Sequence, residues 1–314
     1  MACFALYNYQ FVKQPLGDSR QSYLKGMEPN VKDADEYFRR KQEIFGELFE
    51  KDYANERNSI HFQGKNRADD YSYRYVIRPT HGIIIFRLIN VHELSFQDET
   101  LKKNVQKDFR DLVVVIDNRP GIQRLAIESN TRAFSNLIQV EWILASAFNE
   151  YLKFYGLSIH IDNLQDSNDF WRYIDDRTYG KGFWKVSFHL PPLNLERLKK
   201  VDQEVWKKFR SSFGTGMECS FQAEKGGRVK LDPKDKLQTE TVKWLMEDVG
   251  GNTIRLFPRG GKMIVLGHSS YKYIIIPDSV FERLQRFEDG ELLFPDNEAL
   301  DSVKSNIESG IKDT

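Results

Sequence analysis

Two strand-like segments joined by a turn sequence constrain the fold of this chain more than any other feature. Residues 111–116 and 122–128 are largely apolar, and residues 117–121 between them, DNRPG, have the composition of a tight turn. We therefore expect a β-hairpin here. Residues 71–78 and 82–91, which flank a Pro-Thr-His sequence, predict a second hairpin. Because hairpins join antiparallel strands, the fold is not a simple repeat of βαβ units.

Helical and strand-like segments alternate along the rest of the chain. Apolar side chains recur at helical spacing over 38–49, 130–155, 168–175, 193–213, 236–249 and 278–287. Short strand-like segments lie at 2–12, 157–161, 183–189, 217–222, 253–257, 263–266 and 271–276. The polar stretch 93–108 predicts a loop with a short helical piece. The sequence therefore predicts an α+β protein with mixed, largely antiparallel sheets and packed helices, and the segment 183–257 fits a split βαβ unit of the ferredoxin-like kind.

The length of 314 residues is sufficient for two domains of ordinary size. The polar stretch near residues 100–110 is where we expect the boundary. Residues 1–108 would then form an N-terminal α+β domain, and residues 109–295 a larger α+β domain. Residues 296–314 would form an acidic, weakly ordered tail.

The cysteines and the apolar segments indicate a cytoplasmic protein. Cys3 and Cys219 each lie in a predicted strand, and we expect two buried thiols in a reducing compartment. The first residues lack the basic region of a signal peptide. The apolar segments are far shorter than the roughly 20 residues that a membrane-spanning helix needs.

The distribution of charge indicates the kind of partner. The whole chain has 46 basic and 46 acidic residues. Residues 181–272 hold 18 Lys and Arg against 10 Asp and Glu, whereas residues 277–314 hold 4 against 10. A basic block in a neutral protein favours a polyanion as partner over a small substrate.

The basic block predicts contacts with the phosphates of DNA or RNA, because Lys and Arg beside glycines can approach a backbone closely. The charges predicted to make these contacts are Lys185, Lys199, Lys200, Lys207, Lys208, Arg228, Lys230, Arg255, Arg259 and Lys262. On the predicted helix 193–213, acidic residues partly neutralise the bases. Trp184, Trp206 and Trp244 have the chemistry to stack on bases, although we expect at least two of the three to lie in a core. No helix-turn-helix, zinc-finger or RNP-type sequence supports sequence-specific recognition.

No catalytic signature accompanies the basic block. The six histidines lack metal-binding spacing, and the glycine pairs lack the frame of a P-loop or a Rossmann site. We therefore expect no cofactor and favour a protein without chemistry of its own.

Two alternatives stay open. One is a metal-dependent nuclease or hydrolase with Asp117, Glu128, His160 and Asp162 as ligands. The other is a protein-binding scaffold that forms a homo-oligomer, with the acidic tail of one copy docked on the basic block of another.

One segment resembles a known family. Residues 184–191, WKVSFHLP, precede a predicted helix, the strand 217–222, a Lys-rich segment and another helix. In this layout, and in the short string K-V-x-x-x-L-P, residues 184–249 resemble the Rex-type phage-exclusion proteins. The resemblance implies a non-catalytic, dimeric, DNA-associated protein of a bacterial or prophage defence system.

Overall fold

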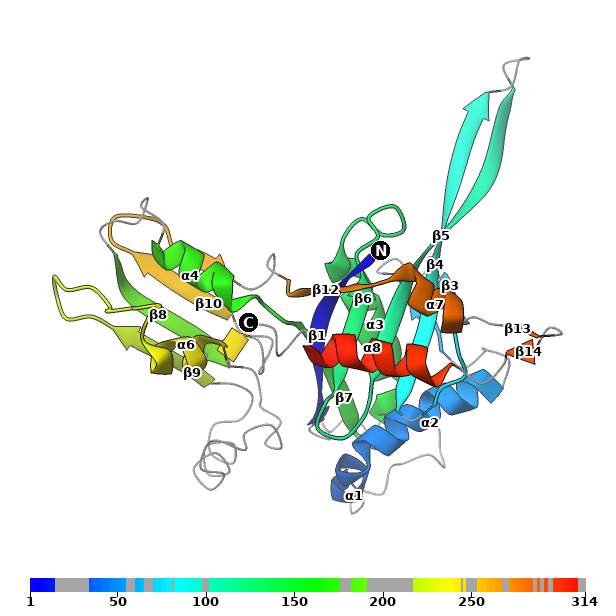
Figure 1. Ribbon diagram of the computed structural model, residues 1–314, viewed down its shortest axis with the longest axis horizontal. Helices are drawn as coiled ribbons and strands as arrows, with labels where there is room; N and C mark the ends of the chain where they lie inside the picture. The colour runs from blue at the N-terminus through cyan, green and yellow to red at the C-terminus, as the bar shows by residue number, and fades with distance from the viewer. Residues whose placement is uncertain are drawn as a thin grey trace, which may run out of the picture. The chain divides into compact units, whose positions relative to one another are not determined.

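Helices and antiparallel strands follow one another along the chain in the computed structural model, which confirms the predicted α+β class (Figure 1). The structure describes residues 1–14, 34–54, 60–64, 70–80, 82–97, 102–175, 182–190, 217–243, 245–246, 253–266, 271–284, 287–288, 291–292 and 296–309. The chain divides into two compact units. The first comprises Met1–Phe4, Phe11–His160 and Ile275–Ile307, and the second comprises Ala5–Gln10, Ile161–Ile274 and Glu308–Thr314.

The larger sheet contains eight of the described strands in the order β12-β1-β6-β5-β4-β3-β2, with β7 paired to β1. In chain order they are β1 (Ala2–Lys13), β2 (Phe62–Gln63), β3 (Asp70–Tyr75), β4 (Ile83–Gln97), β5 (Lys103–Asp117), β6 (Arg124–Glu128), β7 (Leu157–Asn163) and β12 (Tyr273–Ile276). Every pair from β2 to β6 is antiparallel. Both predicted hairpins, β3 with β4 and β5 with β6, are therefore confirmed.

An aromatic core holds the first unit together. The described helices of this part include α1 (Ala34–Arg39), α2 (Lys41–Ala54) and α3 (Leu137–Leu152), which a 3₁₀ turn, Lys153–Tyr155, extends. Phe45 and Phe49 of α2 lie 5.2 and 5.6 Å from Phe148 of α3, measured between ring centroids. Phe62 and Phe86 add rings from β2 and β4 to the same cluster. Each of these rings is fully buried, so helices and sheet share one core.

Helix α3 begins later than the sequence predicts. The helical spacing predicts a helix from residue 130, but the first helical residue is Leu137. Asn136 is the cap, because its side-chain oxygen accepts a hydrogen bond from the backbone N–H of Gln139 at 2.8 Å. Asn130 instead holds a turn, since its side chain bonds to Arg132 N and to Asp111 O.

The hairpin of β4 and β5 extends far beyond its neighbours in the sheet (Figure 1). Strand β3 pairs with β4 only as far as Ile89, and β6 pairs with β5 only as far as Val114. The two strands continue as a two-stranded ribbon, from Asn90 opposite Arg110 to Gln97 opposite Lys103. We call residues 90–97 and 103–110 the arm. The loop and helical piece predicted for 93–108 are therefore wrong: most of this stretch is strand.

A second, four-stranded sheet forms the body of the second unit. Its order is β11-β10-β8-β9, made of β8 (Phe183–Leu190), β9 (Met217–Gln222), β10 (Thr253–Pro258) and β11 (Ile264–Leu266). Strand β8 lies between β9 and β10 and is antiparallel to both. Strands β9 and β10 thus run in the same direction, joined through helix α6 (Lys236–Lys243). This is the arrangement of a split βαβ unit, whereas the full ferredoxin-like plan stays a prediction.

Two helices cover one face of this smaller sheet (Figure 1). Phe170 and Trp171 of α4 (Ser167–Asp175) and Val242 of α6 pack against alternate residues of the central strands, which point to one side. The strand residues of this core are Phe183, Val186, Phe188, Ile254, Leu256 and Leu266. The alternate residues of β8 and β10 therefore point to the opposite face.

The C-terminal segment contains α7 (Asp278–Leu284), the short hairpin of β13 (Phe287–Glu288) and β14 (Glu291–Leu292), and α8 (Asn297–Ser309). Helix α8 buries Leu300, Val303 and Ile307, within the segment expected to be a weakly ordered tail. The boundary expected between residues 108 and 109 falls inside strand β5.

The cysteine prediction needs one correction. Cys3 lies on β1 as expected, but its side chain is exposed rather than buried, because it stands near the beginning of the strand, before the buried residues. Cys219 lies in the predicted strand, now β9, and its side chain lies outside the described part. No helix of the described residues is long and apolar enough to cross a membrane.

Candidate nucleic-acid interface

Six of the ten predicted contact charges belong to the described residues, and all six lie in the second unit. They are Lys185, Arg228, Lys230, Arg255, Arg259 and Lys262. The other four predicted charges lie outside the described residues: Lys199, Lys200, Lys207 and Lys208. Trp206 and Trp244 also lie outside them. The candidate interface is therefore built from the four-stranded sheet and its turns.

A bulge in strand β8 places an aromatic ring on the face away from the helices. Lys185 pairs with Phe257 and Phe183 pairs with Pro258, so Trp184 between them has no partner residue on β10. Such an extra residue re-aims a side chain. The Trp184 ring lies 5.5 Å from the Phe257 ring and is 37% exposed. Trp184 is thus a surface aromatic, outside the core of this unit.

Basic side chains lie beside these two rings. The Lys185 Nζ lies 5.4 Å from the centre of the Phe257 ring and 3.8 Å from a carboxylate oxygen of Glu218 on β9. Arg255 precedes Phe257 by two residues on the same strand, so both side chains point to the same face. This face therefore combines two aromatic rings with two cations.

Two glycine turns meet at one end of the sheet. The backbone N–H of Arg259 donates to the carbonyl of Gly182 at 3.0 Å, and that of Val229 donates to the carbonyl of Phe183 at 2.8 Å. Gly182 has a φ of +71°, and a Cβ there would lie 3.2 Å from the Arg228 side chain. Glycine is therefore required at this position, and Arg228 and Arg259 lie on either side of it.

An open hollow of about 530 Å³ lies between the two turns, which we call the turn hollow. Trp184 lines it, and its charged residues are Glu224, Lys225 and Arg259. The Nε of Arg259 is buried and makes no hydrogen bond in the described structure. An unsatisfied buried donor is costly, so the Arg259 side chain is held here at an energetic penalty.

The charge around the turn hollow is positive. Residues 182–190, 217–232 and 253–266 hold seven Lys and Arg against three Asp and Glu. Lys230 and Lys262 are exposed and lie on the same two turn segments. The predicted charges that are described thus gather on neighbouring elements of one sheet.

Two members of the site were not among the predicted contacts. Lys225 lines the turn hollow beside Gly226, whose φ is +90°. Phe257 supports Trp184, although as an apolar residue of a predicted strand it suggested only a core position. The available signal was Pro258 at the end of that strand, because proline in a strand often marks a bulge.

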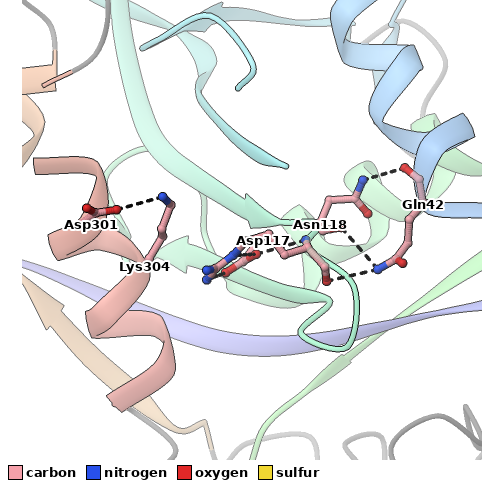
Figure 2. A network of polar contacts seen from close by, with 6 residues as sticks. Gln42, Asp117, Asn118, Asp301 and Lys304 are labelled. Atoms are coloured by element: carbon pink, nitrogen blue, oxygen red, sulfur yellow. Dashed lines mark hydrogen bonds and ion pairs between the residues drawn. The ribbon is translucent and has the colours of Figure 1, made fainter. Parts of the chain in front are cut away.

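Two residues of the metal-site alternative, Asp117 and Glu128, are held by other groups. Figure 2 shows Asp117 beside the turn that Gln42 of α2 binds. The buried Asp117 carboxylate accepts two hydrogen bonds from the Arg119 guanidinium, at 2.9 and 2.7 Å. Glu128 accepts a hydrogen bond from the backbone N–H of Val113 at 2.8 Å, and burial raises the pKa of its carboxyl.

These carboxylates do not form a metal site with one another. The Glu128 carboxylate is bound to the backbone of Val113, which lies four residues before Asp117 on β5. Four residues of a strand span about 13 Å, so the two carboxylates are far apart. His160 is exposed on β7, and Asp162 follows two residues later. Among the described residues, no group of three or more His, Cys, Asp and Glu side chains is placed to hold a metal ion.

Part of the acidic C-terminal segment pairs within its own unit. Arg283 of α7 lies 2.7 Å from both the Asp296 and the Glu298 carboxylates. Asp301 pairs with Lys304 on α8 at 2.9 Å (Figure 2). In the scaffold alternative, these acidic side chains would pair with the basic block of another copy. In the structure they pair with basic side chains of their own unit instead.

Comparison of the chain with protein-family models, with curated proteins and with solved structures gives no match. The fold and the candidate interface therefore define the protein only as a member of the α+β class with a basic, aromatic sheet face.

Proposed function

We propose that this protein binds single-stranded nucleic acid without sequence specificity and performs no chemistry on it. The observation that carries the proposal is the exposed Trp184 ring, turned by a bulge onto a face with Lys185 and Arg255 and bordered by the turn hollow. Single-stranded nucleic acids bind to surfaces that combine a basic groove with aromatic rings.

Two kinds of contact support the proposal. A base stacked on Trp184 contributes about 1–3 kcal/mol, and stacking tolerates every base. Arg259 and Lys225 lie next to that ring, within reach of the neighbouring phosphates. Since a duplex keeps its bases stacked on one another, the ring favours a single strand over a duplex.

The biological setting is also a proposal. The resemblance of residues 184–249 to the Rex-type proteins supports a role in anti-phage defence of a bacterium or prophage. The same resemblance favours DNA as the nucleic acid, and the sheet face itself accommodates DNA and RNA alike.

A direct binding measurement tests the proposal. Fluorescence anisotropy with labelled single strands of about 20 nucleotides, in DNA and RNA forms, and with a matching duplex would give the three affinities. We expect single strands to bind at low salt and the duplex to bind more weakly. Trp184→Ala should weaken single-strand binding by about 5- to 150-fold, the equivalent of one lost stacking contact.

The matched control is Trp142→Ala, because Trp142 on α3 is 39% exposed, close to the value for Trp184, and lies in the first unit. This variant should bind like the wild type. Absence of single-strand binding at low salt, or equal affinities of the Trp184→Ala variant and the wild type, would contradict the proposal.

A further inference from the structure

We propose that the arm is the interface of a symmetric dimer, in which one face of the arm packs on the same face of a second copy of this chain. The inference is independent of the proposed nucleic-acid binding, since the arm lies in the first unit and the turn hollow in the second. It begins from the stability of the arm itself.

The arm is a two-stranded ribbon about 25 Å long, without a third strand on either side within the described residues. An isolated two-stranded ribbon is at best marginally stable in water. The arm also exposes large apolar side chains: Val91 is 39% exposed, Val105 is 56% exposed and Phe109 is 66% exposed. A partner that covers these side chains would stabilise the ribbon.

The register shows that these three side chains share one face. Val91 is directly opposite Phe109, and Ser95 is directly opposite Val105. Residues opposite each other in an antiparallel pair point to the same side, as do residues two apart along a strand. We call this side the apolar face of the arm.

The opposite face is partly covered by the chain itself. Asn90 donates a hydrogen bond to the carbonyl of Ala133 at 2.8 Å, and the His92 ring lies 3.2 Å from the same oxygen. Arg110 binds Asp108 and the carbonyl of Arg132. The turn before α3 therefore packs on that face near the base of the arm, and the apolar face is the one that lacks a described cover.

The charges favour a second copy over a polyanion. The arm carries two acidic side chains, Glu93 and Asp108, and three basic ones, Lys103, Lys107 and Arg110, so its excess of positive charge is a single charge. On the apolar face, Glu93 is directly opposite Lys107, between the Val91–Phe109 row and the Ser95–Val105 row. Of the four rows on this face, the first is apolar and the second pairs an acid with a base, whereas Ser95 lies opposite Val105 and Gln97 lies opposite Lys103.

Such a face is complementary to itself. A two-fold axis along the arm places β4 of one copy over β5 of the other, row against row. Glu93 then faces Lys107 of the second copy, and Val91 faces Phe109 of the second copy. The same contacts occur twice, as a symmetric interface requires. A ribbon of this size covers less area than a standard interface of about 1,600 Å², so we expect a dissociation constant in the micromolar range.

Sedimentation velocity of the full chain tests the inference, with protein from about 1 to 100 μM to span the expected constant. The wild type should pass from monomer to dimer across this range. Phe109→Ser should remain a monomer. Leu94→Ser is the control, because Leu94 is 46% exposed on the opposite face of the arm. This variant should dimerise like the wild type.

A mixing experiment separates the interface from the folding of the arm. Glu93→Lys alone gives two bases in the row of residues 93 and 107, and Lys107→Glu alone gives two acids in that row, so each variant should be monomeric. An equimolar mixture should form a dimer with one copy of each, since every base in the row of residues 93 and 107 then faces an acid. A monomeric wild type at the highest concentration, or a mixture that associates no better than its components, would overturn the inference.

Discussion

The salt dependence of single-strand binding follows from the charges around the turn hollow. Six basic side chains there make no ion pair with a carboxylate of the described residues: Lys225, Arg228, Lys230, Arg255, Arg259 and Lys262. Each phosphate that such a charge neutralises contributes about −0.7 to the slope of log affinity against log salt. Six contacts give a slope of about −4.2, which is about a 340-fold loss of affinity between about 50 and 200 mM salt.

Single substitutions separate the charges from the stacking ring. Arg259→Ala should make the slope less steep by about 0.7, because one phosphate contact is lost. Trp184→Ala should lower the affinity at every salt concentration and leave the slope unchanged, because stacking releases no counterion. Anisotropy titrations at four or more salt concentrations give both quantities from the same data.

The control is Lys236→Ala, which removes a basic residue of the same unit on α6, among the helices that cover the other face of the sheet. Its slope should equal that of the wild type. A wild-type slope near zero would refute phosphate contact at the turn hollow. An equal loss of slope in the Lys236→Ala and Arg259→Ala variants would show that only net charge matters, and would refute the assigned site.

Two further predictions concern the stability of the first unit. Phe49→Ala empties a fully buried position between Phe148 and Phe86. It should lower the free energy of unfolding, measured by urea denaturation, by about 3–5 kcal/mol. A loss below about 1 kcal/mol would contradict the shared aromatic core. Burial raises the pKa of the Glu128 carboxyl above its unfolded value, so the folded state holds the proton more tightly and the protein loses stability as pH rises through that pKa. Glu128→Gln should therefore stabilise the protein at about pH 7 relative to the wild type, with the gain vanishing near pH 4, and an equal effect at both pH values would contradict this.

The hairpins were predictable because their signals are local. The turn sequence at 117–121 and the apolar strands on both sides of it specify β5 with β6 without reference to the rest of the chain. The same holds for the strands of the smaller sheet, whose apolar residues alternate toward the helices. Both features depend on neighbouring residues alone.

The arm was not predictable from periodicity. A strand is recognised by alternation between a buried and an exposed face, and the arm is largely exposed on both faces. Polar and apolar residues such as Glu93, Leu94, Lys107 and Phe109 therefore follow no period of two that separates inside from outside. The sequence resembles a polar loop for this reason.

The candidate interface was predictable in its charges and not in its geometry. Lys and Arg beside glycines indicated the turns, and the structure places Arg228 and Arg259 on either side of Gly182. The position of Trp184 depends on a register shift between two strands about 70 residues apart in sequence. Such a shift is a property of the strand pair, so the residues next to Trp184 in the sequence do not predict it.

The division of the chain into its two units has a consequence for synthesis. The first unit contains Ile275–Ile307 in addition to residues near the N-terminus, and the second unit supplies most of the residues between them. A ribosome that has delivered the first 160 residues has not yet delivered α7 and α8. The second unit is then the earlier of the two to have its central sheet and helices complete. The first unit closes only after the chain has passed residue 300, so its apolar surface stays exposed for longer during translation.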